Sequence, residues 1–306
     1  MKTPKLRVGV DLGGTKIEAV GLRDDGSEIV RHRVPTPRSY EAALEAIAAL
    51  VARVERETKH TGTVGIGIPG TIVPDTGLVK NANSVWLNGR PLGEDLERVL
   101  DREVRVANDA NCFALSEATD GAAAGAAVVF GVILGTGVGG GIVVNGECIA
   151  GVNLVAGEWG HNPLPWAAPD EYPGPSCYCG RMGCIEMWVS GPGLERDHAE
   201  RSNKILSAPE IVDAALGGEP LATMSLSLYC DRLARSLASL VNILDPDVIV
   251  LGGGMSNAPD LPRRVSEIVP RYVLAAGATS TELETRIVRA VHGDSSGVRG
   301  AACLWH

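Results

Sequence analysis

A short strand, a glycine-rich turn and a second strand follow one another twice in this chain. The first unit spans residues 8–22 and turns at Gly13 and Gly14, and the second spans 128–144 and turns at 135–141. Glycine lets the backbone turn tightly between buried strands. We interpret the repetition as an internal duplication. It predicts two related α/β lobes with a cleft between them, which is a usual place for a small-molecule site.

The spacing of apolar residues predicts the elements around these two units. Residues 41–57 place apolar side chains three and four positions apart, as one face of a helix does. A buried strand is predicted at 64–68, and another at 104–107 that leads into a helix at 110–118. A long amphipathic helix is predicted at 226–244. Strands that alternate with helices in this way indicate the α/β class.

The composition excludes several classes of protein. The chain has 306 residues, of which 45% are apolar and 21% charged, so it can bury the core of two domains. Its net charge of −9 argues against nucleic-acid binding. Residues 1–7 contain no apolar run of signal-peptide length, and glycines interrupt the uncharged stretch 121–146. We expect a cytoplasmic protein without a leader, an N-terminal DNA-binding module or a membrane span.

Two glycine-rich hairpins form the candidate phosphate site. The patterns at 65–70 and 135–140 match G-x-G-x-x-G, but neither opens a helix, so NAD binding is not expected. The backbone N–H groups of a glycine hairpin can approach a polyphosphate closely, although such glycines also simply shape hairpins. The candidate phosphate-binding residues are Asp11, Gly13, Gly14, Thr15, Lys16, Gly135, Thr136, Gly137, Gly139 and Gly140. Asp11 is placed to hold Mg²⁺ through water.

Asp109 is the candidate catalytic base. It follows a predicted buried strand and begins a predicted helix, and such junctions commonly hold functional groups in α/β folds. A carboxylate is ionised at neutral pH and can accept a proton from a hydroxyl group. The alternative from the sequence alone is that Asp109 only caps the helix that follows.

Three of the seven cysteines lie within eight residues. Cys177, Cys179 and Cys184 form a C-x-C-x₄-C pattern, and His161 lies upstream as a fourth ligand for structural Zn²⁺. The alternative is a set of buried or redox-active thiols. The odd number of cysteines argues against a disulfide framework, and we expect the scattered ones to be core residues: Cys112, Cys148, Cys230 and Cys303.

Seven motifs resemble the ROK family of bacterial ATP-dependent sugar kinases, within the actin/hexokinase superfamily. In chain order they are VDLGGTK, GIPG, NDAN, LGTGVGGG, GEWGH, CYCGRMGC and VIVLGGG, and they run over essentially the whole chain. The resemblance implies a two-lobed, ribonuclease H-like α/β fold and a reaction that uses ATP, Mg²⁺ and a free sugar. It divides the chain into an N-terminal lobe, 1–119, completed by 290–306, and a C-terminal lobe, 120–289.

The resemblance also implies roles for individual residues. It matches Asp109 to the family's catalytic aspartate, and it matches Asn108, Glu158, His161 and Glu186 to sugar contacts. The alternative is that the two glutamates are solvated surface charges, the commonest fate of glutamate. The signature C-x-C-G-x-x-G-C-x-E implies that zinc joins His161 to the cysteine loop. Weaker sugar-binding candidates are Gly70, Thr71 and Asn83, and further nucleotide-binding candidates are Gly253 and Gly254.

Four longer segments resemble the fructokinases of this family. They lie at 80–89, 156–166, 242–257 and 292–302, and they imply that fructose, with mannose as a second sugar, is phosphorylated at the 6-hydroxyl. The alternatives are a glucokinase or an N-acetylhexosamine kinase of the same family and, from another class, a non-catalytic sugar sensor like the family's repressors. The resemblance implies a homodimer as well.

Overall fold

The computed structural model describes residues 6–274 and 283–305. Residues 1–5, where no leader is expected, lie outside the described part of the chain. The N-terminal sheet has the order β3-β2-β1-β4-β7, with β1 (Leu6–Leu12), β2 (Lys16–Leu22), β3 (Glu28–Pro35), β4 (Gly62–Ile68) and β7 (Val104–Asn108). The C-terminal sheet has the order β10-β9-β8-β11-β12, with β8 (Val128–Leu134), β9 (Val138–Val144), β10 (Glu147–Cys148), β11 (Val248–Gly252) and β12 (Arg286–Arg289).

The two sheets repeat one topology. In the first, β1 pairs antiparallel with β2 and parallel with β4, and β4 pairs parallel with β7. In the second, β8 pairs antiparallel with β9 and parallel with β11, and β11 pairs parallel with β12. The internal duplication predicted from the two glycine hairpins is therefore confirmed at the level of strand order and direction.

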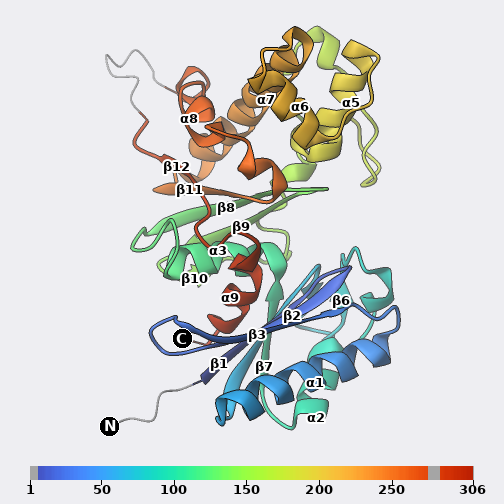
Figure 1. The fold of residues 1–306 in the computed structure, drawn as a ribbon, viewed down its shortest axis with the longest axis vertical. Helices are drawn as coiled ribbons and strands as arrows, with labels where there is room; N and C mark the ends of the chain where they lie inside the picture. Colours follow the sequence, from blue (N-terminus) through green and yellow to red (C-terminus); the bar gives the residue numbers. More distant parts are fainter. Residues whose placement is uncertain (1–5, 275–282, 306) are drawn as a thin grey trace.

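The helices form layers around these sheets (Figure 1). One layer covers the outer face of the N-terminal sheet, with α1 (Tyr40–Thr58) and α2 (Leu92–Leu100). A second layer lies between the sheets, with α3 (Asp109–Thr119) and α9 (Ser296–Ala302). A third covers the far side of the C-terminal sheet, with α5 (Gly191–Ser202), α6 (Ala208–Leu216), α7 (Pro220–Leu244) and α8 (Leu261–Ser266). A two-stranded sheet, β5 (Thr71–Ile72) and β6 (Val79–Lys80), and the short helix α4 (Glu186–Val189) complete the site region.

The helix layer between the sheets depends on two glycines. A Cβ atom on Gly300 of α9 would lie 1.7 Å from the carbonyl oxygen of Cys112 in α3. A Cβ atom on Gly141 of β9 would lie 2.4 Å from the carbonyl oxygen of Ala110. Only glycine permits such close approach of backbones. The first turn of α3, which carries Asp109, is thereby seated directly on the second hairpin.

The placement of α9 supports the proposed division of the chain into lobes. This helix belongs to the C-terminal segment 290–306, yet it packs on β1, β2 and β4 of the N-terminal sheet. The boundaries at 119/120 and 289/290 remain a proposal.

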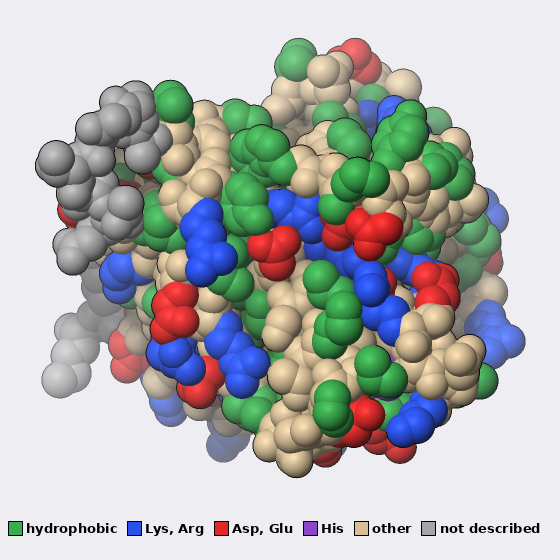
Figure 2. Space-filling model, turned by 90° about the horizontal axis from the view of Figure 1, so that it is seen from above, with side chains coloured by type: hydrophobic (Ala, Val, Ile, Leu, Met, Phe, Trp, Pro, Cys, Tyr) green, Lys and Arg blue, Asp and Glu red, His purple; other side chains and the backbone are tan. Residues whose placement is uncertain are grey.

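The exposed surface carries mixed charge on the face shown in Figure 2, the helical end of the C-terminal half. Lys and Arg side chains lie there beside Asp and Glu side chains. Within the described ranges, no helix is both long and apolar enough to cross a bilayer.

Candidate functional site

A cavity of about 1430 Å³ lies where the two halves of the molecule meet. All the candidate sugar-binding residues line it: Gly70, Thr71, Asn83, Asn108, Asp109, Glu158, His161 and Glu186. The second hairpin lines it too, through Gly135, Thr136, Gly137, Gly139 and Gly140. The first hairpin and the pair Gly253 and Gly254 are not among its lining residues. The candidate sugar-binding residues and the second glycine hairpin therefore line the same cavity.

Asp109 begins α3 at the end of β7, and its neighbour caps the helix. Oδ1 of Asn108 accepts hydrogen bonds from the backbone N–H groups of Ala110 (2.9 Å) and Asn111 (3.3 Å), and its Nδ2 donates to the carbonyl of Gly70 (3.3 Å). Oδ1 of Asp109 also accepts from Ala110 N–H, at 2.7 Å. Because Asn108 supplies the cap, the capping role weighed for Asp109 is not needed to begin the helix.

The electrostatics of Asp109 suit a base that works near neutral pH. Burial raises the pKa of Asp109 to about 6, and the charge of Glu158 adds to the shift, while the N–H of Ala110 opposes it. A general base is most effective when its pKa lies near the operating pH.

Asp11 lies near Asp109 at the end of β1. Burial raises the pKa of Asp11 to about 7, followed by the negative charges of Asp109 and Glu18, while Lys16 lowers it. The negative charge of Asp109 disfavours the ionised form of Asp11, and a divalent cation beside Asp11 would relieve that repulsion. Carboxylate oxygen is a preferred ligand of Mg²⁺. The pair therefore fits the Mg²⁺ role predicted for Asp11.

The two hairpins present glycine backbones at their turns. In the first, Gly13 N–H donates to the carbonyl of Lys16 at 3.0 Å, and Nζ of Lys16 pairs with Glu18 at 3.4 Å. Gly14 and Thr15 at its tip are exposed. In the second, Gly135 N–H donates to the carbonyl of Gly137 at 2.9 Å, and Thr136 is exposed. Exposed turns of this kind leave N–H groups available to an anion.

Gly253 closes the far side of the second hairpin. It has a φ of +79°, and a Cβ atom there would lie 2.5 Å from the carbonyl oxygen of Leu134. Gly253 thus packs against the end of β8, and neither Gly253 nor Gly254 is among the residues that line the cavity.

The two candidate sugar glutamates differ in burial. Glu158 is exposed to the cavity, whereas Glu186 is only 7% exposed. Oε2 of Glu186 accepts a hydrogen bond from the backbone N–H of Val138 at 2.8 Å. The reading of Glu186 as a solvated surface charge is therefore wrong. Its carboxylate instead ties the start of α4 to the second glycine hairpin.

Four side chains form the candidate metal centre. One ligand atom each from His161, Cys177, Cys179 and Cys184 lies within 4.8 Å of all the others. The Nδ1 atom of His161 is 3.6 Å from Sγ of Cys177, and the Sγ atoms of Cys179 and Cys184 are also 3.6 Å apart. Tetrahedral zinc with bonds of about 2.3 Å to sulfur would separate neighbouring ligand atoms by about 3.8 Å. The donor set and its spacing both fit Zn²⁺.

The three thiols of this centre have shifted pKa values. Burial, with the neighbouring thiols Cys179 and Cys177, raises the pKa of Cys184 to about 12, and burial raises that of Cys177 as well. A hydrogen bond from the backbone N–H of Arg181 lowers the pKa of Cys179 to about 7. Three thiols this close together all lose their protons readily only when a bound cation replaces those protons.

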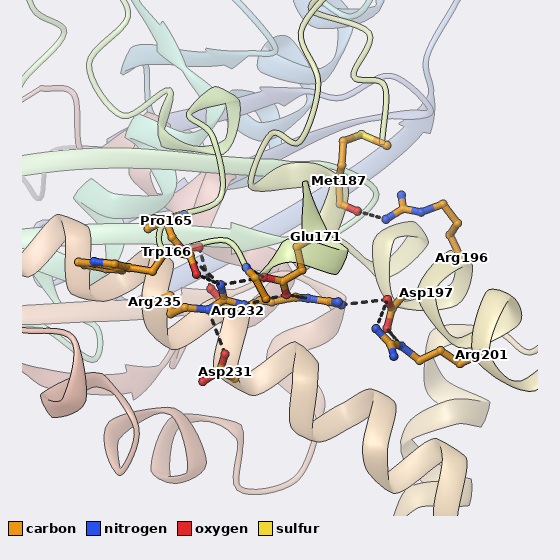
Figure 3. Close-up of polar contacts among 12 residues, drawn as sticks. Pro165, Trp166, Glu171, Met187, Arg196, Asp197, Arg201, Asp231, Arg232 and Arg235 are labelled. Atoms are coloured by element: carbon orange, nitrogen blue, oxygen red, sulfur yellow. Dashed lines mark hydrogen bonds and ion pairs between the residues drawn. The ribbon is translucent and has the colours of Figure 1, made fainter. Parts of the chain in front are cut away.

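A buried ion-pair network, which the sequence analysis missed, anchors the loop before the cysteines. Glu171 accepts hydrogen bonds from Arg232 (2.8 Å) and Arg235 (2.8 and 2.9 Å) of α7. Arg232 also pairs with Asp197 of α5 at 3.2 Å (Figure 3). Although burial opposes it, hydrogen bonding from Arg235 and Arg232 lowers the pKa of Glu171 to about 2. The sequence signal available for this network was the presence of two arginines, Arg232 and Arg235, three residues apart on a largely apolar helix.

The same network continues into α4. The Arg232 guanidinium lies 4.3 Å from the ring centroid of Trp188, and Arg196 donates to the carbonyl of Met187. The hydroxyl of Tyr229 donates to the carbonyl of Val189 at 3.0 Å. Because α4 begins with Glu186, these contacts fix one wall of the cavity.

Comparison with known proteins places the chain among proteins of similar length. A model of the ROK family matches residues 7–306. An N-acetyl-D-glucosamine kinase from Escherichia coli O127:H6 is 44% identical over 302 residues, which cover 97% of this chain and 98% of that protein.

Two solved structures are similar along their whole lengths. The ROK hexokinase from Thermus thermophilus is 34% identical, with a TM-score of 0.84 and 97% of both chains covered. A ROK family glucokinase from Streptomyces griseus, solved in complex with glucose and AMPPNP, is 30% identical, with a TM-score of 0.78 and 98% of both chains covered.

Proposed function

The chain belongs to the ROK family of sugar kinases, and from this we propose that it transfers phosphate from ATP to the 6-hydroxyl of N-acetyl-D-glucosamine. The observation that carries the choice of sugar is the 44% identity to an N-acetyl-D-glucosamine kinase over nearly the whole chain. The relatives described above do not support the fructokinase subgroup expected from the motifs. They favour the alternative, an N-acetylhexosamine kinase or a glucokinase of the same family.

In the proposed mechanism Asp109 acts on the 6-hydroxyl. Its carboxylate accepts the hydroxyl proton as the oxygen attacks the γ-phosphorus of ATP, and ADP leaves. Phosphoryl transfer depends mainly on positioning and charge neutralisation. Glu158, Glu186 and His161 hold the sugar, and the cap made by Asn108 holds the start of α3.

The hairpins hold the nucleotide. Their backbone N–H groups and the hydroxyls of Thr15 and Thr136 donate hydrogen bonds to the phosphates. Mg²⁺ beside Asp11 would neutralise phosphate charge when bound. Glu186 connects the sugar-binding part of the site to the nucleotide-binding part, since it accepts a hydrogen bond from Val138 of the second hairpin.

We expect activity on the sugar to depend on pH through Asp109. The base must be ionised, and its pKa is about 6, so kcat/KM for the sugar falls as the pH drops below about 6 and reaches a plateau above it. A Glu158→Gln variant removes a negative charge that raises the pKa, so its profile shifts to lower pH. Initial rates from pH 5 to 8 at saturating Mg-ATP measure both curves; rates independent of pH across this range would contradict the assignment.

Zinc in the cysteine centre would have a structural role. All four ligands come from the protein, so no coordination position is left for a reacting water. The zinc ion would join His161, three residues after Glu158, to the cysteine loop, which ends two residues before Glu186. It thereby holds the sugar-binding side chains from both sides.

A Cys179→Ser variant is expected to lose zinc and, together with it, sugar affinity or folding. Serine oxygen is a poor replacement for a thiolate ligand of zinc. Metal content by mass spectrometry and KM for the sugar measure the two effects. Cys230→Ser, outside the centre, is the control and retains zinc. Full activity in a metal-free preparation would refute this role.

A panel assay tests the proposed function. ADP release is measured with purified protein, Mg-ATP and N-acetylglucosamine, glucose, mannose or fructose. We expect the highest kcat/KM with N-acetylglucosamine. A preference for fructose would restore the subgroup expected from the motifs, and no ADP release with any sugar would favour the non-catalytic sensor.

Glucose is the second candidate substrate, because the Streptomyces griseus glucokinase shares 30% identity over 98% of the chain. The homodimer expected from the resemblance remains a prediction, which sedimentation velocity measures.

A further inference from the structure

A hydrogen bond links the two halves of the molecule beside the cavity. Nζ of Lys80 donates to the backbone carbonyl oxygen of Asn153 at 3.0 Å, although the two residues lie 73 positions apart. Lys80 ends β6 in the small two-stranded sheet, which follows β4 of the N-terminal sheet in the chain. Asn153 lies in the loop 150–157, which follows β10 of the C-terminal sheet. The bond therefore connects the part of the chain that leads to Asp109 with the part that leads to Glu158.

This hydrogen bond lies at the rim of the cavity. The residues that follow its two partners, Asn81 and Leu154, line the cavity, whereas Lys80 and Asn153 are not among the lining residues. Lys80 is half-buried and Asn153 is exposed. The bond is therefore placed to hold the cavity walls together from outside, and neither partner is placed to touch a bound sugar.

The backbone of Lys80 is fixed relative to the side of the cavity that carries the candidate base. Lys80 pairs with Thr71 in the two-stranded sheet. A Cβ atom on Gly70 would lie 2.8 Å from the carbonyl oxygen of Lys80, so the two segments are in close contact. The carbonyl of Gly70 also accepts the hydrogen bond from Nδ2 of Asn108, the residue before Asp109. Lys80 is thus attached to the segment that positions Asp109.

The loop 150–157 is fixed at its end and exposed at Asn153. A Cβ atom on Gly157 would lie 2.3 Å from a backbone carbonyl oxygen of β9, so the end of the loop is seated on the C-terminal sheet. Glu158 follows directly and lines the cavity. Asn153, nearer the middle of the loop, is held by the ammonium group of Lys80. Loss of this hydrogen bond would therefore loosen the loop without unseating its end.

We propose that Lys80 is a positioning residue. Its hydrogen bond to Asn153 holds the loop that leads into Glu158 against the half of the molecule that carries Asp109, and so keeps the cavity closed around a bound sugar. The inference rests on the proposed function. A hydrogen bond from an ammonium group is stronger than one between neutral groups. A lysine side chain is also flexible, so the bond can open and re-form as the sugar enters and the product leaves.

Lys80→Met tests this role, because methionine keeps the unbranched apolar chain and removes the charged donor. KM for the sugar is expected to rise about fivefold, the effect of losing one partly exposed hydrogen bond. The bond is present before and during phosphate transfer, so kcat and KM for ATP should change by less than about twofold. Lys80→Arg keeps a charged donor and should restore the KM for the sugar. The control is Lys204→Met, which replaces an exposed lysine after α5, and every rate is measured with the best sugar of the panel assay.

Hydrogen–deuterium exchange gives a readout that does not depend on turnover. In the substrate-free protein, the amides of the loop 150–157 should exchange faster in Lys80→Met than in wild type, while the amides of α7 keep their rates. Unchanged exchange in this loop would overturn the inference.

The kinetic outcomes separate this inference from the proposed function. An active wild type, with an unchanged KM for the sugar in Lys80→Met, overturns the role of Lys80 alone. Equal losses of kcat/KM for the sugar and for ATP, with a lower midpoint of thermal unfolding, also overturn it, because they indicate a purely structural role. Wild-type protein that releases no ADP with any sugar overturns the proposed function and this inference together.

Discussion

Asp109→Asn is expected to lower kcat about 10³-fold while sugar binding is largely retained. Asparagine has nearly the same size and still accepts the hydrogen bond from Ala110, so the start of α3 stays in place. It cannot accept a proton from the 6-hydroxyl. Steady-state ADP release gives kcat, and calorimetric titration with N-acetylglucosamine gives the binding constant.

The matched control is Asp213→Asn, an exposed aspartate of α6 far along the chain from the cavity residues, which should leave both quantities unchanged. If Asp109→Asn kept more than a tenth of wild-type turnover, the base would have to be another group. If it lost sugar binding and turnover equally, Asp109 would be a binding residue rather than the base.

Glu171→Gln is expected to lower the free energy of unfolding by about 3 kcal/mol. Glu171 faces two arginines that are themselves buried, Arg232 and Arg235, and its neutral replacement leaves excess positive charge in the interior. Each arginine keeps one other acid, Asp197 or Asp231, so the fold survives. Denaturant unfolding followed by circular dichroism measures the change.

The control is Glu267→Gln, which breaks an exposed ion pair with Arg263 and should hardly change the free energy of unfolding. The pH dependence gives a second check. The pKa of Glu171 is lowered from 4.5 to about 2, so its stabilisation is present above about pH 4.5 and is lost as the pH falls toward 2. The difference between wild type and variant must shrink over that range. A constant difference would contradict the ion-pair explanation.

Local patterns predicted the central strands of both sheets, the helices α1, α3 and α7, and the parts of the site that are contiguous in sequence. The helix expected at 110–118 is Asp109–Thr119, and the one expected at 41–57 is Tyr40–Thr58. The helix expected at 226–244 begins earlier, at Pro220, because Glu219 and the following proline supply a good N-terminus. Glycine hairpins and closely spaced cysteines are likewise short-range signals that a single sequence carries.

The missed features depend on residues far apart in the chain. Glu171 meets Arg235 across 64 positions, and nothing in the proline-rich segment around Glu171 indicates a buried partner. Glu186 of α4 likewise meets Val138 of β9 across 48 positions. The choice of sugar was the least secure step, since several sugars share the same core motifs.

The product itself tests the central claim most directly. Wild-type protein is incubated with Mg-ATP and N-acetylglucosamine, and phosphorus–proton correlated NMR locates the new phosphoester. We expect phosphate on oxygen 6 of N-acetylglucosamine, formed in step with ADP and absent with Asp109→Asn. Phosphate on another oxygen, or ATP hydrolysis to free phosphate without a sugar ester, would contradict it.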